Sequence, residues 1–288
     1  MSFDLWFSDF TSPTQKLSLK IKETLYRGRS EFQEILVVDS YDFGRVLVLD
    51  DAIQTTERDE WFYHEMIAHV PLMAHPAPRS VLVVGGGDGG TVREVLRHPG
   101  VGRVTMVEID RLVVEQSKQW LPGIACGLDD PRVTIEIADA VAFVKTREAA
   151  YDVILVDSSD PVGPGEGLFT EAFYRDARKA LKPGGVLVAQ TESPVALEGA
   201  MRRAYRHMYA AFPRVETYTG LVPTYSGQLW SFSFCSEGRG PEDELREADF
   251  AALEPQLQYY NREIHRSAFA LPTFVKRLLA EARPSAVR

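Results

Sequence analysis

The sequence has only two cysteines, Cys126 and Cys235, and no long apolar run. The cysteines are too few and too far apart for a disulfide framework or a C-x-x-C metal site. No apolar stretch approaches the ~20 residues that a membrane-spanning helix needs. The first residues, MSFDLWFSDF, lack the basic and apolar regions of a signal peptide. We therefore expect a cytoplasmic protein with no membrane anchor.

The sequence also has fewer basic than acidic residues. Lys and Arg number 32 against 41 Asp and Glu, for a formal net charge of -9. This balance argues against nucleic acid bound through its phosphates and mildly favours cationic small molecules. With 288 residues, 45% of them apolar and 25% charged, the chain is typical of a globular protein with one large core or two modest ones.

The hydrophobic pattern divides the chain into two predicted domains. Residues 1–56 carry short β-type runs separated by polar or glycine turns, which predicts a small antiparallel sheet. A helical stretch opens at Thr56, and from residue 81 to 236 short apolar runs alternate with helical segments. That alternation predicts a doubly wound α/β fold. We therefore expect an N-terminal β-sheet domain, 1–56, and a Rossmann-like catalytic domain, 57–288, with a helical C-terminal extension.

Carboxylates follow the predicted strands of the α/β domain, without an interleaved Lys or Arg. In open parallel sheets, ligands bind outside the carboxyl ends of the strands, so these side chains should face one crevice. They are Asp88 after the first strand, Glu108 and Asp110 after the second, Asp139 after the third, and Asp157 and Asp160 after the fourth.

The first of these strands runs into a glycine loop, VLVVGGGDGG, with Gly85, Gly87 and Gly90 in G-x-G-x-x-G spacing. Alone this spacing is a weak signal, because a strand-to-helix turn needs glycines for structural reasons as well. Glu108, about 20 residues further on, could accept both hydroxyls of a ribose, which favours an adenosyl ligand. Asp88 would repel a pyrophosphate, so an adenosyl sulfonium suits the loop better than a dinucleotide.

The fourth strand leads directly into the loop Asp157-Ser158-Ser159-Asp160-Pro161. Either aspartate could simply cap a turn, as Asp before proline often does. Two carboxylates facing an adenosyl sulfonium could also hold an ammonium group and accept its proton. The loop therefore indicates alkylation of an amine.

Seven stretches, in order, resemble the spermidine synthase (polyamine aminopropyltransferase) family: EFQEILVVDS, FGRVLVLDDAIQTTERDEWFYHEMIAHVPL, VLVVGGGDGGTVREVLRH, VEID, DDPRV, YDVILVDSSDPVGPGEGLFT and VPTYSGQLW. The tract 50–72 is the most specific, because it lies outside the adenosyl-binding core that methyltransferases share. The resemblance implies a Rossmann-like, methyltransferase-type sheet. It also implies aminopropyl transfer from decarboxylated S-adenosylmethionine, a co-substrate, to putrescine, giving spermidine and methylthioadenosine. No cofactor is expected, and the resemblance implies a homodimer or homotetramer.

The resemblance also implies roles for individual residues. Asp157 is the expected catalytic residue, which takes the proton of the attacking amine. The expected amine-binding residues are Gln54, Tyr63, His64, Asp88, Asp157, Ser158, Ser159, Asp160 and Tyr225, with Trp6 as a looser match. The expected adenosyl-binding residues are Gln33, Gly85, Gly87, Asp88, Glu108, Asp139, Ala140 and Pro164. His64 and His69 are five residues apart, unlike the i, i+4 pair of a helical zinc site, so no metal is expected.

Two departures and three alternatives remain open at this point. Ala140 stands where many relatives have glycine after an acidic residue, and Glu192 lies in a variable segment that could meet the far end of the amine. The acceptor could instead be agmatine, cadaverine or spermidine. A methyltransferase is disfavoured by Asp88 and Asp157. A catalytically silent binding protein would be expected to lack one of those two carboxylates.

Overall fold

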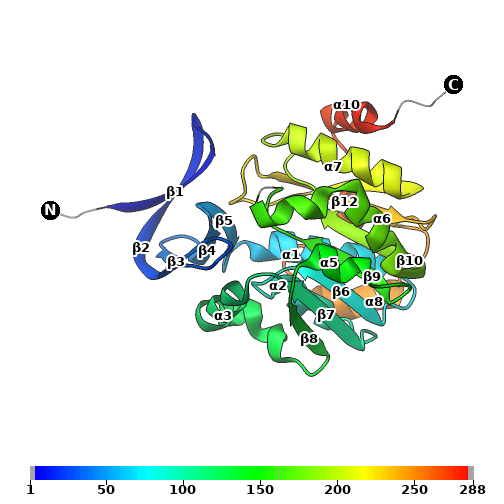
Figure 1. Ribbon diagram of the computed structural model, residues 1–288, viewed down its shortest axis with the longest axis horizontal. Coiled ribbons are helices and arrows are strands. Elements are labelled where there is room, and N and C mark those ends of the chain that lie inside the picture. The colour runs from blue at the N-terminus through cyan, green and yellow to red at the C-terminus, as the bar shows by residue number, and fades with distance from the viewer. Residues whose placement is uncertain (1–3, 162, 285–288) are drawn as a thin grey trace.

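The first sheet of the computed structural model, which describes residues 4–161 and 163–284, is antiparallel (Figure 1). Its strands lie side by side in chain order: β1 (Leu5–Ser12), β2 (Gln15–Arg29), β3 (Glu34–Ser40), β4 (Gly44–Leu49) and β5 (Ala52–Thr56). Alternate side chains pack on opposite faces, as the pleat of a strand requires. Ile35, Val37 and Leu47 contact Val113 and Ile124 of the second domain, whereas Val38, Val46 and Val48 form a separate cluster.

The second sheet is mainly parallel, in the order β11-β12-β10-β9-β6-β7-β8. Near one edge, β12 pairs antiparallel with both β10 and β11, and the remaining neighbouring strands pair in parallel. The strands are β6 (Ser80–Gly85), β7 (Arg103–Glu108), β8 (Val133–Ile137), β9 (Tyr151–Asp157), β10 (Leu181–Gln190), β11 (Arg214–Leu221) and β12 (Leu229–Ser236). β6 lies between β7 and β9, so the strands that follow it are added first on one side of β6 and then on the other. Ligands bind at such a switch in strand order, which places the expected crevice beside the carboxyl end of β6.

Helices cover both faces of the second sheet (Figure 1). They are α1 (Glu60–Ala74), α2 (Gly90–Leu96), α3 (Arg111–Trp120), α4 (Pro122–Ala125), α5 (Ala140–Lys145), α6 (Glu171–Ala180), α7 (Glu198–Ala211), α8 (Glu247–Leu253), α9 (Arg262–Ser267) and α10 (Thr273–Ala282). Val81 and Val83 of β6 pack in the core cluster that includes α1, α2 and α8. Leu82 and Val84 face the opposite cluster, with α5, α6, α7 and α10.

The predicted fold class is confirmed, and two local predictions are wrong. The helix expected to open at Thr56 begins at Glu60, because Thr56 pairs with Val46 as the last residue of β5. Strands β1 and β11 were not anticipated; each is held by pairing with the strand that follows it along the chain. Within the described residues, no helix is long and apolar enough to cross a membrane.

Candidate active site

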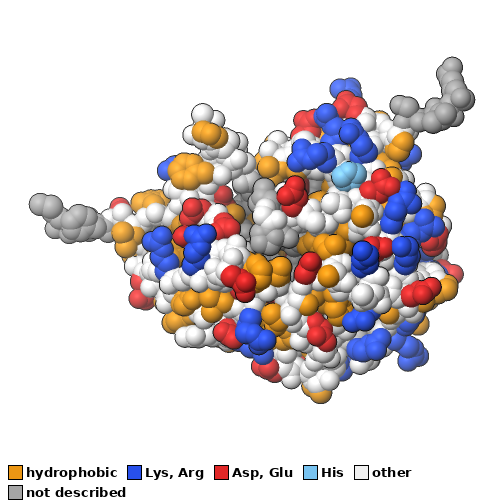
Figure 2. All heavy atoms as spheres, viewed as in Figure 1, with side chains coloured by type: hydrophobic (Ala, Val, Ile, Leu, Met, Phe, Trp, Pro, Cys, Tyr) orange, Lys and Arg blue, Asp and Glu red, His pale blue; other side chains and the backbone are white. Residues whose placement is uncertain are grey.

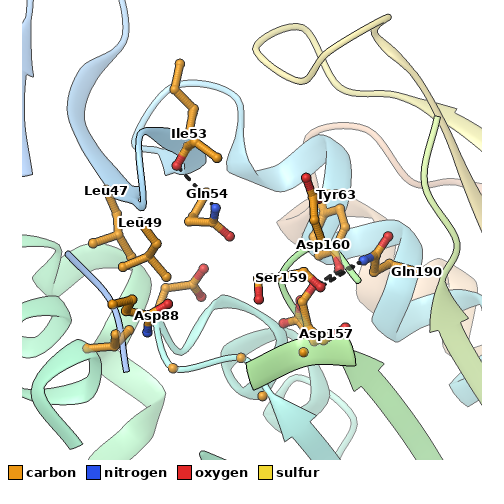
Figure 3. Close-up of a pocket in the computed structure, with 18 of the residues that line it drawn as sticks. Leu47, Leu49, Ile53, Gln54, Tyr63, Asp88, Asp157, Ser159, Asp160 and Gln190 are labelled. Atoms are coloured by element: carbon orange, nitrogen blue, oxygen red, sulfur yellow. Dashed lines mark hydrogen bonds between the residues drawn. The ribbon is translucent and has the colours of Figure 1, made fainter. Parts of the chain in front are cut away.

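A cavity of about 220 Å³ lies between the two sheets, where the carboxyl ends of β6, β7 and β9 face β4 and β5 (Figure 3). Among the residues that the structure describes, no Lys or Arg lines it. On the outer face seen in Figure 2, by contrast, basic and acidic side chains are interspersed. The cavity therefore concentrates negative charge, and its carboxylates are Asp9, Asp88, Glu108, Asp139, Asp157 and Asp160.

The structure brings the expected amine- and adenosyl-binding residues to this cavity, apart from the looser match Trp6 and from Pro164, whose side chain lies outside the part of the chain that is described. Asp110, which was expected to face the same crevice, does not line the cavity among the described residues, because its side chain caps α3. Trp6, the looser match, is 57% exposed on β1 and does not line the cavity among the described residues. Sequence reasoning missed Asp9, Gln190 and Trp230 as lining residues. Asp9 belongs to a strand that was not predicted. Gln190 ends strand β10 and Trp230 ends the stretch VPTYSGQLW, so both carried a sequence signal that was not used.

Asp157 ends β9 at the centre of the cavity, and both of its carboxylate oxygens are held. Tyr63 donates its hydroxyl hydrogen to Oδ1 at 2.8 Å, and Thr91 donates to Oδ2 at 2.7 Å. Burial raises the pKa of Asp157 above its ordinary value, and the charge of Asp88 adds to the rise. The arrangement produces an oriented carboxylate that is more basic than a free aspartate.

Gly85 makes room for this strand end. Its φ is +78°, and a Cβ atom there would lie 2.1 Å from the backbone oxygen of Asp157. We expect Gly85→Ala to lower the free energy of unfolding by about 2 kcal/mol more than Gly184→Ala does, through overpacking. Gly184 is a matched control, since it has the same φ of +78° but nothing within 4 Å of its added Cβ. Chemical denaturation of both variants would check this, and equal losses would show that only the backbone conformation matters.

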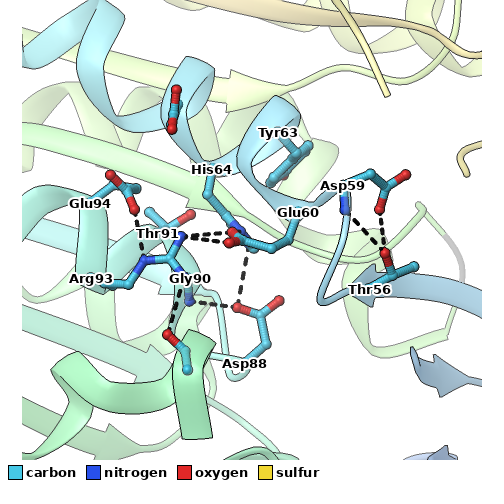
Figure 4. Close-up of polar contacts among 12 residues, drawn as sticks. Thr56, Asp59, Glu60, Tyr63, His64, Asp88, Gly90, Thr91, Arg93 and Glu94 are labelled. Carbon is cyan, nitrogen blue, oxygen red and sulfur yellow. Dashed lines mark hydrogen bonds and ion pairs between the residues drawn. The ribbon is translucent and has the colours of Figure 1, made fainter. Parts of the chain in front are cut away.

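Asp88 is held in the glycine loop by the backbone and by a histidine (Figure 4). Its Oδ1 accepts from the Gly90 N–H at 2.7 Å and lies 3.4 Å from Nε2 of His64. His64 was expected in the amine channel as a direct lining residue; it lines the cavity but is also buried against Glu60, with Nδ1 2.6 Å from that carboxylate. Gly90 allows this packing, because a Cβ there would lie 2.2 Å from the ring of His64.

At the opposite end of the cavity, Glu108 and Gln33 are fixed by Asp110. The Asp110 N–H donates to Glu108 Oε1 at 2.9 Å, and Gln33 donates its amide Nε2–H to Asp110 Oδ2 at 2.9 Å. The amide oxygen of Gln33 is thereby left to accept from a ligand. Burial raises the pKa of Glu108 to about 7. Gly87 gives this carboxylate space, since a Cβ there would lie 2.9 Å from Glu108 Oε2.

A second set of acidic side chains lies beyond Asp157, at the side of the cavity nearest β1. The Ile53 N–H donates to Asp9 Oδ2 at 3.0 Å, and the charge of Asp9, after burial, raises the pKa of Asp160. Glu192 does not line the cavity among the described residues; it lies behind Gln190, whose Nε2 donates to its Oε1 at 3.2 Å. Burial, followed by the charge of Asp160, raises the pKa of Glu192 to about 8.

One wall of the cavity, beside Asp157, is aromatic (Figure 3). Tyr63 lies with its ring centroid 5.7 Å from that of Tyr225, and the Tyr225 hydroxyl donates to the backbone oxygen of Gln54 at 2.5 Å. Trp230 packs edge-on against Tyr225. Such a wall suits the methylene groups of a diamine, while the carboxylates suit its ends. Over residues 4–161 and 163–284, no group of three or more His, Cys, Asp or Glu is arranged to hold a metal ion.

Two family models match the chain. Residues 60–247 match the spermine/spermidine synthase domain, and residues 5–57 match the spermidine synthase tetramerisation domain. A polyamine aminopropyltransferase from Moorella thermoacetica is 49% identical over 276 residues, which cover 96% of each chain. One from Thermoanaerobacter sp. is 46% identical over 280 residues, covering 96% of this chain and 99% of the relative.

Solved structures agree with these relatives. A crystal structure of spermidine synthase in complex with the transition-state analogue AdoDATO superposes with a TM-score of 0.94 at 42% identity, covering 96% of this chain and 95% of the other. Spermidine synthase from Thermotoga maritima superposes with a TM-score of 0.91 at 40% identity, covering 96% of this chain and 94% of the other. Both domains are thus matched in sequence, and the fold is matched over almost the whole chain.

Proposed function

Because this chain belongs to the spermine/spermidine synthase family of polyamine aminopropyltransferases, we propose that it transfers the aminopropyl group of decarboxylated S-adenosylmethionine to putrescine. The products are spermidine and methylthioadenosine. The observation that carries the proposal is the position of Asp157, which is oriented by two hydroxyl groups inside a cavity without lysine or arginine among the described residues.

The reaction is an in-line displacement at carbon. The amine nitrogen of putrescine forms a bond to the methylene carbon beside the sulfonium sulfur, and the carbon–sulfur bond breaks with its electron pair going to sulfur. An alkylammonium with a pKa near the ~10.4 of lysine has no lone pair at neutral pH, so its proton must first leave. Asp157 takes that proton, and burial of its carboxyl raises its pKa toward that of the amine.

The two ends of the cavity hold the two parts of the donor. Glu108 and Gln33 accept from the ribose hydroxyls, with Asp139 and Ala140 beside the adenine ring. Asp88 faces the ammonium at the aminopropyl end, because both of its contacts among the described residues use Oδ1 and leave Oδ2 for the ligand. No cofactor or metal takes part in these steps.

The acceptor's far ammonium lies at Asp9 and Asp160 in this proposal. Asp9 already uses Oδ2 to accept from the Ile53 N–H, so one oxygen is left for a single ammonium donor. A planar guanidinium, such as that of agmatine, is best held by both oxygens of one carboxylate. At Asp9, this contrast favours the ammonium of putrescine over the guanidinium of agmatine.

A panel of amines tests the assignment. We expect incubation with decarboxylated S-adenosylmethionine and putrescine to release methylthioadenosine and spermidine, both measured by mass spectrometry. Release of methylthioadenosine with agmatine alone would change the assigned acceptor to agmatine, and a failure to release methylthioadenosine with any amine would overturn the proposed function. S-adenosylmethionine in place of the decarboxylated donor is the control, and methylated products from it would indicate a methyltransferase instead.

We also propose a homo-oligomer assembled through the N-terminal sheet. Leu5, Trp6 and Phe10 of β1 expose 54%, 57% and 61% of their surface, and the matched tetramerisation domain covers the same strands. Apolar side chains exposed together on an edge strand are typical of an interface between subunits. Cys126 and Cys235 are both free thiols, which is compatible with a reducing cytoplasm.

A further inference from the structure

A buried row of alternating charges runs behind Asp88, between α1 and α2 (Figure 4). His64 contacts Asp88 through Nε2 at 3.4 Å and Glu60 through Nδ1 at 2.6 Å. Glu60 in turn accepts from NH2 of Arg93 through both oxygens, at 2.9 and 2.7 Å. The Nε of Arg93 donates to Glu94 Oε1 at 2.7 Å. Only Asp88 and His64 of this row line the cavity among the described residues, so the others act on a ligand only through them.

Every element packed around His64 supplies a charged or titratable group. These are Glu60 and Tyr63 from its own helix, Asp88 from the loop before α2, Arg93 from α2, and Asp157 from β9. Burial alone would lower the pKa of His64, but Asp88 and then Glu60 outweigh it, so its pKa lies well above the ordinary value. An imidazole ring with a carboxylate at each nitrogen donates from both only when it carries both protons.

We propose that Glu60 and Arg93 are positioning residues, which hold His64 as an imidazolium so that its Nε2–H fixes one oxygen of Asp88 and turns the other toward the aminopropyl group. The identity of the ligand in this inference rests on the proposed function. The protonation of His64 is independent of that function.

The carboxylates of the cavity explain why a positive charge is placed beside Asp88. Asp88 and Asp157 are both buried, and the charge of each disfavours the ionised form of the other. Burial raises the pKa of Asp88, but the neighbouring His64 lowers it by more, so the pKa of Asp88 lies below its ordinary value. Arg93 adds a second positive partner to Glu60 beside His64, which offsets the cost of burying that carboxylate. Each member of the row therefore keeps the next in its charged form.

Glu60→Gln is the direct test. A glutamine amide can donate to Nδ1 of a neutral His64, whose Nε2–H would still point at Asp88 but without the positive charge that pairs with the carboxylate. We expect KM for decarboxylated S-adenosylmethionine to rise about tenfold from the loss of this ion pair, with a smaller change in kcat. The rise should begin at lower pH than any rise in the wild type, because His64 loses its proton sooner. Arg93→Lys keeps a positive charge beside Glu60 and should restore most of the affinity that Arg93→Gln loses.

Glu65→Gln is the matched control. Glu65 lies on the same helix and is also buried, but it accepts the backbone N–H groups of residues 258–260 and, among the described residues, makes no hydrogen bond or ion pair with His64. We expect it to lower stability without changing the pH dependence of KM. An equal rise in KM for both variants would reduce Glu60 to a structural role and overturn the proposal.

A measurement without turnover separates this inference from the proposed function. Histidine labelled with carbon-13 at Cε1 gives signals from the 6 histidines, and His64→Asn identifies the one of interest. We expect His64 to titrate above the pH range of an ordinary histidine in the wild type, and at lower pH in Glu60→Gln. A neutral His64 in the wild type at pH 7 would overturn the inference even if the enzyme is active. A protonated one would support it even if putrescine proves the wrong acceptor.

Discussion

Replacing Asp157 with asparagine is expected to lower kcat by about 10²- to 10⁴-fold, the contribution of a positioned general base. Asparagine keeps one oxygen to accept from one of the hydroxyls of Tyr63 and Thr91, and its amide NH2 can donate to the other, so the side chain can stay in place. It cannot take the ammonium proton. Steady-state kinetics with putrescine would measure the loss. Calorimetry with methylthioadenosine should give near-normal affinity, because the adenosyl group is held at the other end of the cavity.

Asp152→Asn provides the control for this variant. Asp152 lies on the same strand at the opposite end, where it accepts from the Ser80 N–H at 2.8 Å and pairs with Lys182 at 3.0 Å. Its loss should lower stability and leave kcat nearly unchanged. Near-normal turnover by Asp157→Asn would place the base on another group.

The pH dependence of the wild type follows from the same carboxyl. The pKa of Asp157 is raised, so the carboxyl keeps its proton to higher pH than a free aspartate. Only the ionised form can act as a base, so kcat should increase as pH rises through this pKa. In a profile of kcat against pH, the rise on the acid side should therefore occur at higher pH than the pKa of an ordinary aspartate. This rise should be absent from Asp157→Asn.

The sequence was sufficient to predict the family, the fold class and most of the cavity's polar residues, although many of these were named only from the family resemblance. For the carboxylates the reason is local: Asp88, Glu108, Asp139 and Asp157 each follow a buried strand, and parallel strands bring their carboxyl ends to one edge. The position of a residue at the end of a strand can be predicted from the residues next to it in the sequence. Its hydrogen-bond partners come from distant parts of the sequence and cannot be predicted in this way.

The contacts of His64 illustrate what could not be predicted. Its partners Glu60 and Asp88 are 4 and 24 positions away, and its packing depends on the missing side chain of Gly90. The third glycine of the loop was interpreted as part of a turn, whereas in the structure it provides space for an imidazole ring. Asp9 was missed for a related reason, because it reaches the cavity from a strand that depends on pairing with β2.

The discrimination between donors gives the last prediction, for Asp88→Asn. Ordinary S-adenosylmethionine carries a carboxylate beside its ammonium, whereas the decarboxylated donor carries the ammonium alone. Two unit charges 4 Å apart interact by about 4 kcal/mol at an effective dielectric constant of 20. The imidazolium of His64 offsets part of the Asp88 charge, so about 2 to 3 kcal/mol of repulsion remains. We expect the variant to narrow the preference for the decarboxylated donor by about 100-fold.

Calorimetric titration of the variant with each donor measures this preference without turnover. Asp139→Asn is the matched control, because Asp139 is exposed and caps α5 by accepting from the Val141 N–H at 2.8 Å. It should affect both donors equally. An unchanged ratio in Asp88→Asn would mean that His64 neutralises Asp88 completely and that the shape of the cavity selects the donor. A narrowed ratio would show that the carboxylate in the glycine loop, which would repel a pyrophosphate, also excludes the ordinary sulfonium donor.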